Sequence, residues 1–248
     1  MSRANPNPKT FTSNPATVFL EWAAGQGTES NPGGYLKFWN KEEKKNEKVH
    51  SFTFAYLDER SGVGGFYPKF GSNAFSNEVK NTATEPLVVK GWNDGKAEVI
   101  KEGIYQEIKD TLLVNGIKYT KIVYGTVVES SNLALKPGTI FRLGLKGSGV
   151  SAWLDFKDKE SGAIDVGFLE NEKGQTKWKQ ITLSSVPISE DDNDNAIAQS
   201  FALDKFFLAE RIKKDFPEPE ALPNSSPVES ETVPAGVDDD LPFWALPT

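Results

Sequence analysis

Cysteine is absent from the chain, which excludes disulfide bonds, iron–sulfur clusters and zinc sites built on thiolates. Histidine occurs once, as His50, at the edge of a charged run. A Ser-His-Asp triad or an imidazole metal site would depend on this one side chain, so we expect a protein with no catalytic residues, no metal site and no cofactor.

Long hydrophobic runs are also lacking. No stretch approaches the roughly 18 apolar residues that a membrane-spanning helix needs, and the polar N-terminal residues contain no signal-peptide core. We therefore expect no membrane association and a cytoplasmic location.

Negative charge is concentrated at one end of the chain. The formal net charge is −7 at pH 7, but residues 215–248 contain eight Asp or Glu and no Lys or Arg. Residues 1–214 consequently hold 28 basic and 27 acidic side chains, a net charge of +1. A near-neutral body with an acidic tail differs physically from a uniformly acidic protein.

The two ends differ in composition from the rest of the chain. Residues 1–16 are rich in Pro, Asn, Ser and Thr and predict a flexible arm. Residues 216–248 contain seven of the 15 prolines, and such a segment cannot bury enough apolar surface to offset its ordering entropy. We therefore divide the chain into an arm (1–16), a folded domain (17–214) and a disordered, acidic, Pro-rich tail (215–248).

Short β-rich runs broken by Gly, Pro, Asn and Asp predict an all-β domain. In one of them Phe52, Phe54 and Tyr56 alternate with smaller residues. The predicted strands are Thr17–Trp22, Tyr35–Trp39, Ser51–Leu57, Leu87–Lys90, Lys118–Val128, Thr139–Leu145, Ser151–Lys157, Ala163–Glu170 and Thr176–Leu183.

Three segments between the strands have their own signals. Asn115-Gly116 is typical of a type I′ hairpin that joins the run Leu112–Val114 to the next strand. The Gly-rich residues 61–65 predict a mobile loop that presents the aromatic residues after it. Residues 102–110 are ambiguous, because the spacing of Ile104 and Ile108 also fits a short helix.

One C-terminal helix is clearly indicated at residues 196–213 by apolar residues at helical spacing. Asp194 or Asn195 is the expected N-cap, and the acidic residues before it are expected to form a capping loop. Arg211 and the lysines after it suit the negative C-terminal end of the helix.

Aromatic and basic residues are interleaved in several of these strands. Binding of single-stranded nucleic acid uses aromatic faces for the bases and Lys or Arg for the phosphates, although rings in strands usually pack in a core. The candidate DNA-binding residues are Tyr35, Phe38, Trp39, Phe66, Tyr67, Lys69, Phe70, Lys90, Trp92, Lys118, Tyr119, Lys121, Lys177 and Trp178.

The end of the tail has the features of a docking peptide. Three carboxylates suit a basic rim, Pro242 reduces the freedom lost on binding, and two apolar residues can anchor in a pocket. The candidate partner-binding residues are Asp238, Asp239, Asp240, Leu241, Pro242, Phe243 and Trp244.

Residues 238–243 resemble the acidic tip of bacterial single-stranded DNA-binding proteins, which ends Asp-Asp-Asp-Ile-Pro-Phe. The resemblance implies an elaborated OB-fold barrel that coats single-stranded DNA (ssDNA) without sequence specificity in replication, recombination and repair. It also implies recruitment of a polymerase, helicase, primase or nuclease through the tip, in a bacterial or phage-infected cytoplasm. In that family the Phe ends the chain, whereas here Trp244 follows as an added anchor.

Other interpretations remain open at this stage. Another β-sandwich or barrel fits the same strands, and the chain is compatible with a protein-interaction module that binds no DNA. A Mg²⁺-dependent hydrolase or nuclease would need acids such as Asp155, Asp158 and Asp165, which form no recognisable motif. A homo-oligomer is compatible with the sequence.

Overall fold

The computed structural model describes residues 13–23, 35–173 and 176–215, with the backbone alone for residues 23, 172–173, 176–178 and 211–215. Within these ranges the chain is mostly β-sheet, which confirms the predicted class. The strands are β1 (Val18–Ala23), β2 (Tyr35–Asn40), β3 (Lys45–Val49), β4 (Phe52–Tyr67), β5 (Ser72–Ser76), β6 (Leu87–Asn93), β7 (Lys96–Gly103), β8 (Lys118–Ser130), β9 (Ile140–Leu145), β10 (Ala163–Lys173) and β11 (Thr176–Val186). The helices are α1 (Tyr105–Val114), α2 (Ser148–Asp155), α3 (Glu190–Asp215) and the short 3-10 helix η1 (Pro68–Phe70).

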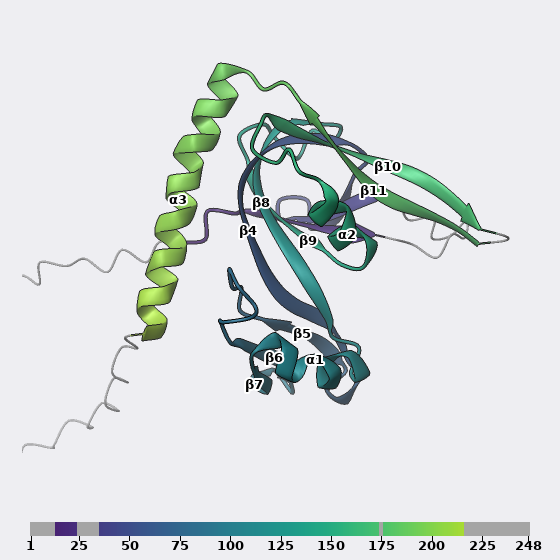
Figure 1. The fold of residues 1–248 in the computed structure, drawn as a ribbon, viewed down its shortest axis with the longest axis vertical. Helices are drawn as coiled ribbons and strands as arrows, with labels where there is room; N and C mark the ends of the chain where they lie inside the picture. Colours follow the sequence, from purple (N-terminus) through teal and green to yellow (C-terminus); the bar gives the residue numbers. More distant parts are fainter. Residues whose placement is uncertain (1–12, 24–34, 174–175, 216–248) are drawn as a thin grey trace, which may run out of the picture.

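The long strand β4 and its antiparallel neighbour β8 connect two parts of the molecule (Figure 1). The first residues of β4 also pair with β10, and its last residues pair with β5. The upper of these two parts contains eight strands. They pair in the order β3-β2-β1-β9-β8-β4-β10-β11, and β1 runs parallel to β9. We call this curved upper part the barrel, although within the described residues its end strands, β3 and β11, do not pair with each other.

The barrel encloses the largest hydrophobic core. Phe52 and Phe54 of β4 meet Phe141 of β9 edge-on, at ring-centroid distances of 5.2 and 5.1 Å. Helix α2 lies inside the curve of the strands, and its Trp153 is completely buried in this core. Inward-facing aromatic residues of β4 and β9 thus pack against one another across β8 in the core that also contains Trp153 of α2.

Below the barrel, the end of β4 and strands β5, β6 and β7 form a second part, which we call the lower lobe (Figure 1). One face of this small sheet packs on α1 through Tyr67, Ile108 and Leu112. At Gly65 a Cβ atom would lie only 2.3 Å from the backbone oxygen of Gly116, so only glycine fits there. Residues 61–65 belong to strand β4, so the predicted mobile loop is wrong.

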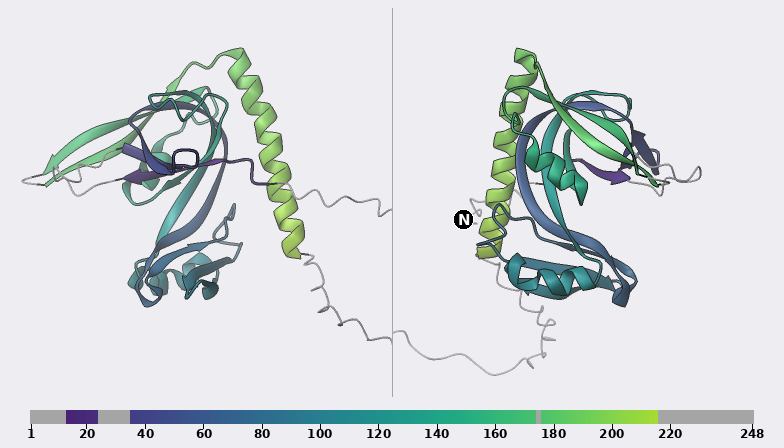
Figure 2. Two further views of the ribbon diagram at one scale, coloured as in Figure 1. Left: turned by 180° about the vertical axis from the view of Figure 1, so that it is seen from behind. Right: turned by 45° about the vertical axis from the view of Figure 1, so that its right-hand side comes forward.

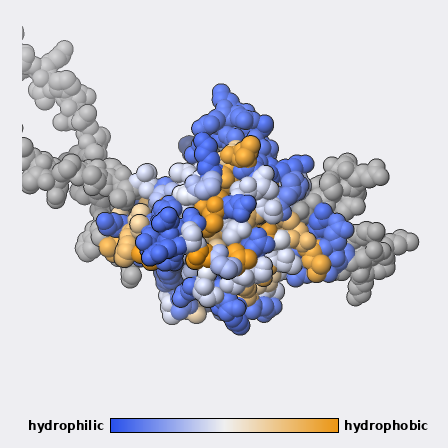
Figure 3. Space-filling model, turned by 90° about the horizontal axis from the view of Figure 1, so that it is seen from above, coloured by the Kyte–Doolittle hydropathy of each residue, from blue (hydrophilic) through white to orange (hydrophobic). Residues whose placement is uncertain are grey.

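Helix α3 lies along one side of the molecule, beside the outer face of β4 and β8 (Figures 1 and 2). Leu203 is fully buried there, and the guanidinium of Arg60 stacks on the ring of Phe207 at 3.3 Å. Among the described residues, no helix combines the length and hydropathy needed to cross a membrane. In the view from above, hydrophobic residues form small groups separated by hydrophilic ones (Figure 3).

Several local predictions need correction. Ser151–Lys157 is not a strand but lies mainly in α2, where Val150 and Trp153 have the i, i+3 spacing of one helix face. Leu112–Val114 ends α1 instead of entering a hairpin, and Gly116, with φ of +76°, follows the helix in the left-handed conformation that favours glycine. The C-terminal helix is therefore one of three α-helices in the described part of the chain.

Helix α3 begins earlier than predicted. Residues 190–195, four of which are acidic, form its first turns, where their charge suits the positive end of the helix. Ser189, and neither Asp194 nor Asn195, provides the cap: its hydroxyl oxygen accepts the Asp192 backbone N–H at 3.2 Å and donates to the Asp192 carboxylate at 2.6 Å.

Candidate nucleic-acid interface

The lower lobe carries three exposed aromatic side chains on the sheet face opposite α1. Phe66 of β4, Phe75 of β5 and Trp92 of β6 have exposed fractions of 56%, 45% and 49%. Their neighbours Tyr67, Ala74 and Gly91 are buried on the other face, as strand alternation requires. We call the surface formed by Phe66, Phe75 and Trp92 the ring face.

Two lysines lie among these rings. Lys90 is directly opposite Phe75 across the β5–β6 pair, and Lys118 is opposite Gly64 across the β4–β8 pair. Neither lysine has an ion-pair partner within the described ranges. Gly64, which has no side chain, lies between Lys118 and Phe75, and these two residues pair with it from either side.

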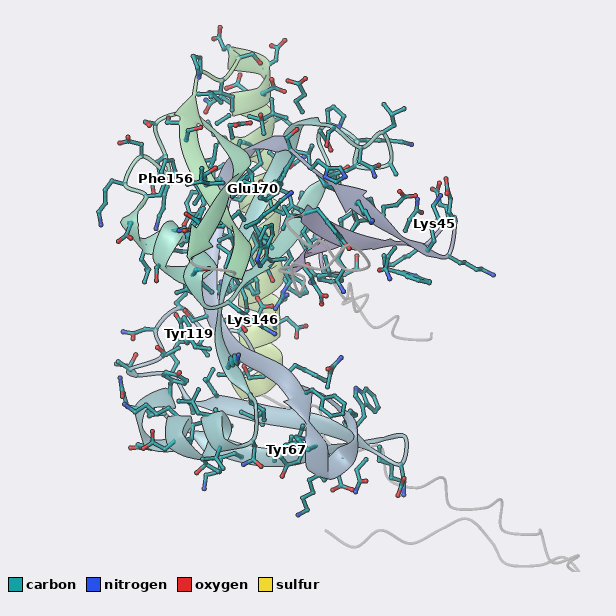
Figure 4. The ribbon with its side chains drawn as sticks, turned by 90° about the vertical axis from the view of Figure 1, so that its right-hand side faces the viewer. Lys45, Tyr67, Tyr119, Lys146, Phe156 and Glu170 are labelled. Atoms are coloured by element: carbon teal, nitrogen blue, oxygen red, sulfur yellow. The ribbon has the colours of Figure 1, made fainter. Side chains whose placement is uncertain are left out.

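Lys146, just after β9, approaches the same surface. Its Nζ lies 3.6 Å from the position that a Cβ atom on Gly64 would occupy. In Figure 4 Lys146 lies between the lower lobe that carries Tyr67 and the part of the barrel that carries Lys45. Partial burial lowers the pKa of Lys146; Glu21 opposes this effect, while Arg142 and Lys118 lower the pKa further.

A second exposed group of aromatic and basic residues lines a groove on β1 and β2 of the barrel. Phe19 and Trp39 are exposed there, and Lys37 and Lys41 lie beside them. The groove has a volume of about 220 Å³ and is completed by Thr17, Glu21, Phe38 and Asn46. Lys37 forms an ion pair with Glu21 at 3.5 Å. We call this feature the β1–β2 groove.

Some predicted DNA-binding residues are occupied by structural contacts. Phe38 and Tyr67 are buried in the two cores. Lys121 is buried and paired with Glu59 at 2.7 Å. Tyr67 and Lys121 therefore have no free ring face or ammonium for a ligand, and Phe38 contributes only as a buried lining residue of the β1–β2 groove.

The other predicted residues divide between partly covered and exposed positions. Phe70 packs edge-on against Tyr67, and the hydroxyl of Tyr119 hydrogen-bonds that of Ser61 at 2.7 Å. The ammonium of Lys48 lies 4.7 Å above the ring of Tyr35. The exposed positions are Trp39, Phe66, Lys69, Lys90, Trp92 and Lys118.

The remaining candidate residues fall outside the described part of the structure. Lys177 and Trp178 lie in β11, but their side chains are not described. The partner-binding residues Asp238, Asp239, Asp240, Leu241, Pro242, Phe243 and Trp244 belong to residues 216–248, as does almost all of the predicted tail.

Sequence reasoning missed Phe75, Phe19 and Lys146. Phe75 belongs to the short polar strand Ser72–Ser76, whose alternation around the buried Ala74 was a weak signal. Phe19 was recognised only as part of a strand. Nothing in the local sequence of Lys146 indicates that it approaches Gly64, because that contact depends on the pairing of β4, β8 and β9.

The described residues contain no group of three or more His, Asp or Glu side chains arranged to hold a metal ion.

Comparison of the chain with protein-family models, curated proteins and solved structures gives no match. The interface must therefore be interpreted from its own geometry.

Proposed function

We propose that this protein binds ssDNA without sequence specificity and has no enzymatic activity of its own. The observation that carries the proposal is the ring face, where three exposed aromatic side chains share one surface with two unpaired lysines. Exposed rings stack on bases of any sequence, and lysines between them offset the charge of the phosphates. Duplex DNA keeps its bases stacked on each other, so the rings favour the single strand.

The order of the barrel strands supports the same proposal. Strands β4, β8 and β9 are antiparallel neighbours, and β10 returns after α2 to pair with β4. This is the order of a Greek key, and β11 adds a fifth strand. OB folds are partly open, five-stranded Greek-key barrels that bind oligonucleotides on their second and third strands and nearby loops.

With β4 as the first strand of an OB barrel, the lower lobe is an insertion between its first and second strands. The ring face then occupies the position of a loop that OB folds use for oligonucleotides. In this proposal β1, β2 and β3 are additions beside the third strand, β9.

The tail adds a proposed role in recruitment, which rests on the sequence alone. Three adjacent carboxylates followed by Leu241, Pro242 and Phe243 suit a basic pocket with an apolar floor. We propose that replication, recombination or repair proteins bind this peptide while the body coats ssDNA. The proposal places the protein in a bacterial or phage-infected cytoplasm.

The test is a titration of the full chain with a labelled oligothymidylate and with a duplex of equal length, at low and at high salt. We expect tighter binding to the single strand, with log affinity falling by about 0.7 per neutralised phosphate in log salt. Phe75→Ala should weaken binding, whereas Phe201→Ala, which removes an even more exposed ring from α3, should not.

Equal affinity for both DNA forms would contradict the proposal. So would an absence of binding to ssDNA combined with retention of a protein partner on the ring face, which is the result expected of a protein-interaction module.

A further inference from the structure

The β1–β2 groove has the same chemical character as the ring face but lies on a different part of the molecule. Its two exposed rings, Phe19 and Trp39, adjoin Lys37 and Lys41. The register of β1 and β2 places Glu21 opposite Lys37, so Glu21 already neutralises one of these cations in part. Lys41 has no ion-pair partner among the described residues and leaves the groove with a cation available to a ligand.

Lys146 connects the groove to the ring face. On the side of the groove, β9 runs parallel to β1, and Gly144 of β9 is paired with Glu21. On the side of the ring face, the Lys146 ammonium lies 3.6 Å from the Cβ position of Gly64. The charges of Glu21 and Lys118, one from each surface, both act on Lys146. This lysine is therefore at the junction of the two surfaces.

The junction contains more positive than negative charge. Lys146 has no ion-pair partner in the described ranges, and Lys118 is equally unpaired. Arg142 is engaged by the carboxylate of Glu78 at 2.6 Å, so it does not compete for a new anion. A phosphate group would provide the missing counter-ion for these two lysines.

We propose that the ring face and the β1–β2 groove are two halves of one path for a single DNA strand, with Lys146 binding the phosphate at the point where the strand passes between them. The inference rests on the proposed function and extends it, because it adds Phe19, Trp39 and Lys146 to the binding site. A short oligonucleotide occupies the ring face alone, and a longer one occupies both surfaces.

The experiment measures the affinity of the full chain for oligothymidylates of about 4 to 16 nucleotides, the range of site sizes known for single OB domains. Trp39→Ala should lower the affinity for the longest oligonucleotide by about fivefold or more, the effect of losing one stacked base. It should leave the affinity for the shortest unchanged. Trp92→Ala should lower the affinity for all lengths. Both side chains are exposed, so the melting temperature should not change.

Lys146 is tested by salt dependence. Lys146→Gln should reduce the slope of log affinity against log salt by about 0.7 for the long oligonucleotide, which corresponds to one lost phosphate contact. Lys146→Arg keeps the charge and should keep the slope.

The outcomes separate this inference from the proposed function. If wild-type protein binds no oligonucleotide of any length, the proposed function fails. If Trp92→Ala weakens binding while Trp39→Ala and Lys146→Gln leave the affinity for every length unchanged, the proposed function stands and the two-part path is wrong. If Trp39→Ala also lowers the affinity for the shortest oligonucleotide, the proposal that a short strand occupies the ring face alone is wrong.

Discussion

Phe66 and Tyr67 are neighbours in β4, yet their side chains lie on opposite faces of the sheet. Phe66 belongs to the ring face, and Tyr67 is buried against α1 and meets the ring of Phe70 edge-on at 4.9 Å. Both residues interleave with the same lysines in the sequence. Only the pleat of the strand gives one a surface role and the other a core role.

The pair Phe66→Ala and Tyr67→Ala tests this division. Phe66→Ala should reduce ssDNA binding by about 1–3 kcal/mol, the contribution of one stacked base, with little change in the free energy of unfolding. Tyr67→Ala should lower the free energy of unfolding by about 3 kcal/mol or more because it leaves a cavity in the core. Urea denaturation and oligonucleotide titration of both variants provide the measurement; the reverse pattern would exchange the two roles.

The partly buried carboxylate of Glu59 on β4 holds three donors together. Its carboxylate binds Lys121 at 2.7 Å, accepts the indole N–H of Trp153 at 2.6 Å and binds Lys159 at 3.2 Å. Burial disfavours its ionised form, but these hydrogen bonds and charges outweigh burial and hold the pKa of Glu59 below its usual value. The ionised carboxylate therefore stabilises the fold.

Glu59→Gln should lower the free energy of unfolding at pH 7 by about 1–3 kcal/mol, because Lys121 keeps its charge without a matching anion. A carboxyl group with a lowered pKa stabilises the fold above its unfolded pKa of about 4.3 and loses that effect as the pH falls through the folded value. The difference between wild type and variant should therefore shrink in acid. Urea denaturation at pH 7 and below pH ~4 measures it, and a difference that did not depend on pH would contradict the assignment.

Among the elements, helix α3 is stabilised both by its N-terminal cap and by its packing against β4 and β8. The Ser189 hydroxyl hydrogen-bonds the backbone N–H and the carboxylate of Asp192 in the first turn. Leu203 and Phe207 pack the middle of the helix against β4 and β8. Tyr124 of β8 meets the Phe207 ring edge-on at 5.4 Å. The helix thereby covers apolar residues on the outer face of the β4–β8 pair without covering the ring face.

Ser189→Ala should destabilise the protein by about 1 kcal/mol through loss of the cap. Ser200→Ala in the same helix is the matched control, since the Ser200 hydroxyl only bonds back to the Ile197 carbonyl at 2.7 Å and alanine is the better helix former. Thermal unfolding followed by circular dichroism should show a lower melting temperature for the first variant only. Equal effects of both substitutions would indicate that Ser189 is not the cap.

For the whole molecule, we expect the negative charge of residues 216–248 to lower the affinity for ssDNA. This segment contains seven acidic residues and no basic ones, so removing it changes the formal net charge from −7 to 0 while keeping α3 whole. We expect the truncated chain to bind ssDNA more tightly, because a tethered acidic segment competes with phosphates at an effective concentration on the order of millimolar.

The comparison uses full and truncated chains with one oligonucleotide at two salt concentrations. The gain in affinity should shrink at high salt, since salt screens both the tail and the DNA. In the full chain Phe243→Ala should impair recruitment of partner proteins and leave the affinity for ssDNA almost unchanged. Weaker ssDNA binding after truncation would contradict the competition.

The mainly β class followed from the sequence because strand alternation is a local property: the runs at Lys118–Val128 and Thr139–Leu145 predicted β8 and β9 closely. The apolar spacing of α3 was equally readable, although its start was not. Short elements failed, because α2 and β5 offer too few residues to separate the two periodicities.

The sequence by itself also established that the chain has no cysteine and that an acidic end follows a near-neutral body. It showed as well that many aromatic residues lie beside lysines. Which rings face outward was decided only by tertiary structure, through the three partners of β4 and the position of α1. Phe66, Phe75 and Trp92 share a face because the consecutive strands β4, β5 and β6 pair in one register. Lys146 meets Gly64 only through the long-range pairing of β4, β8 and β9, which sets contacts that no local pattern encodes.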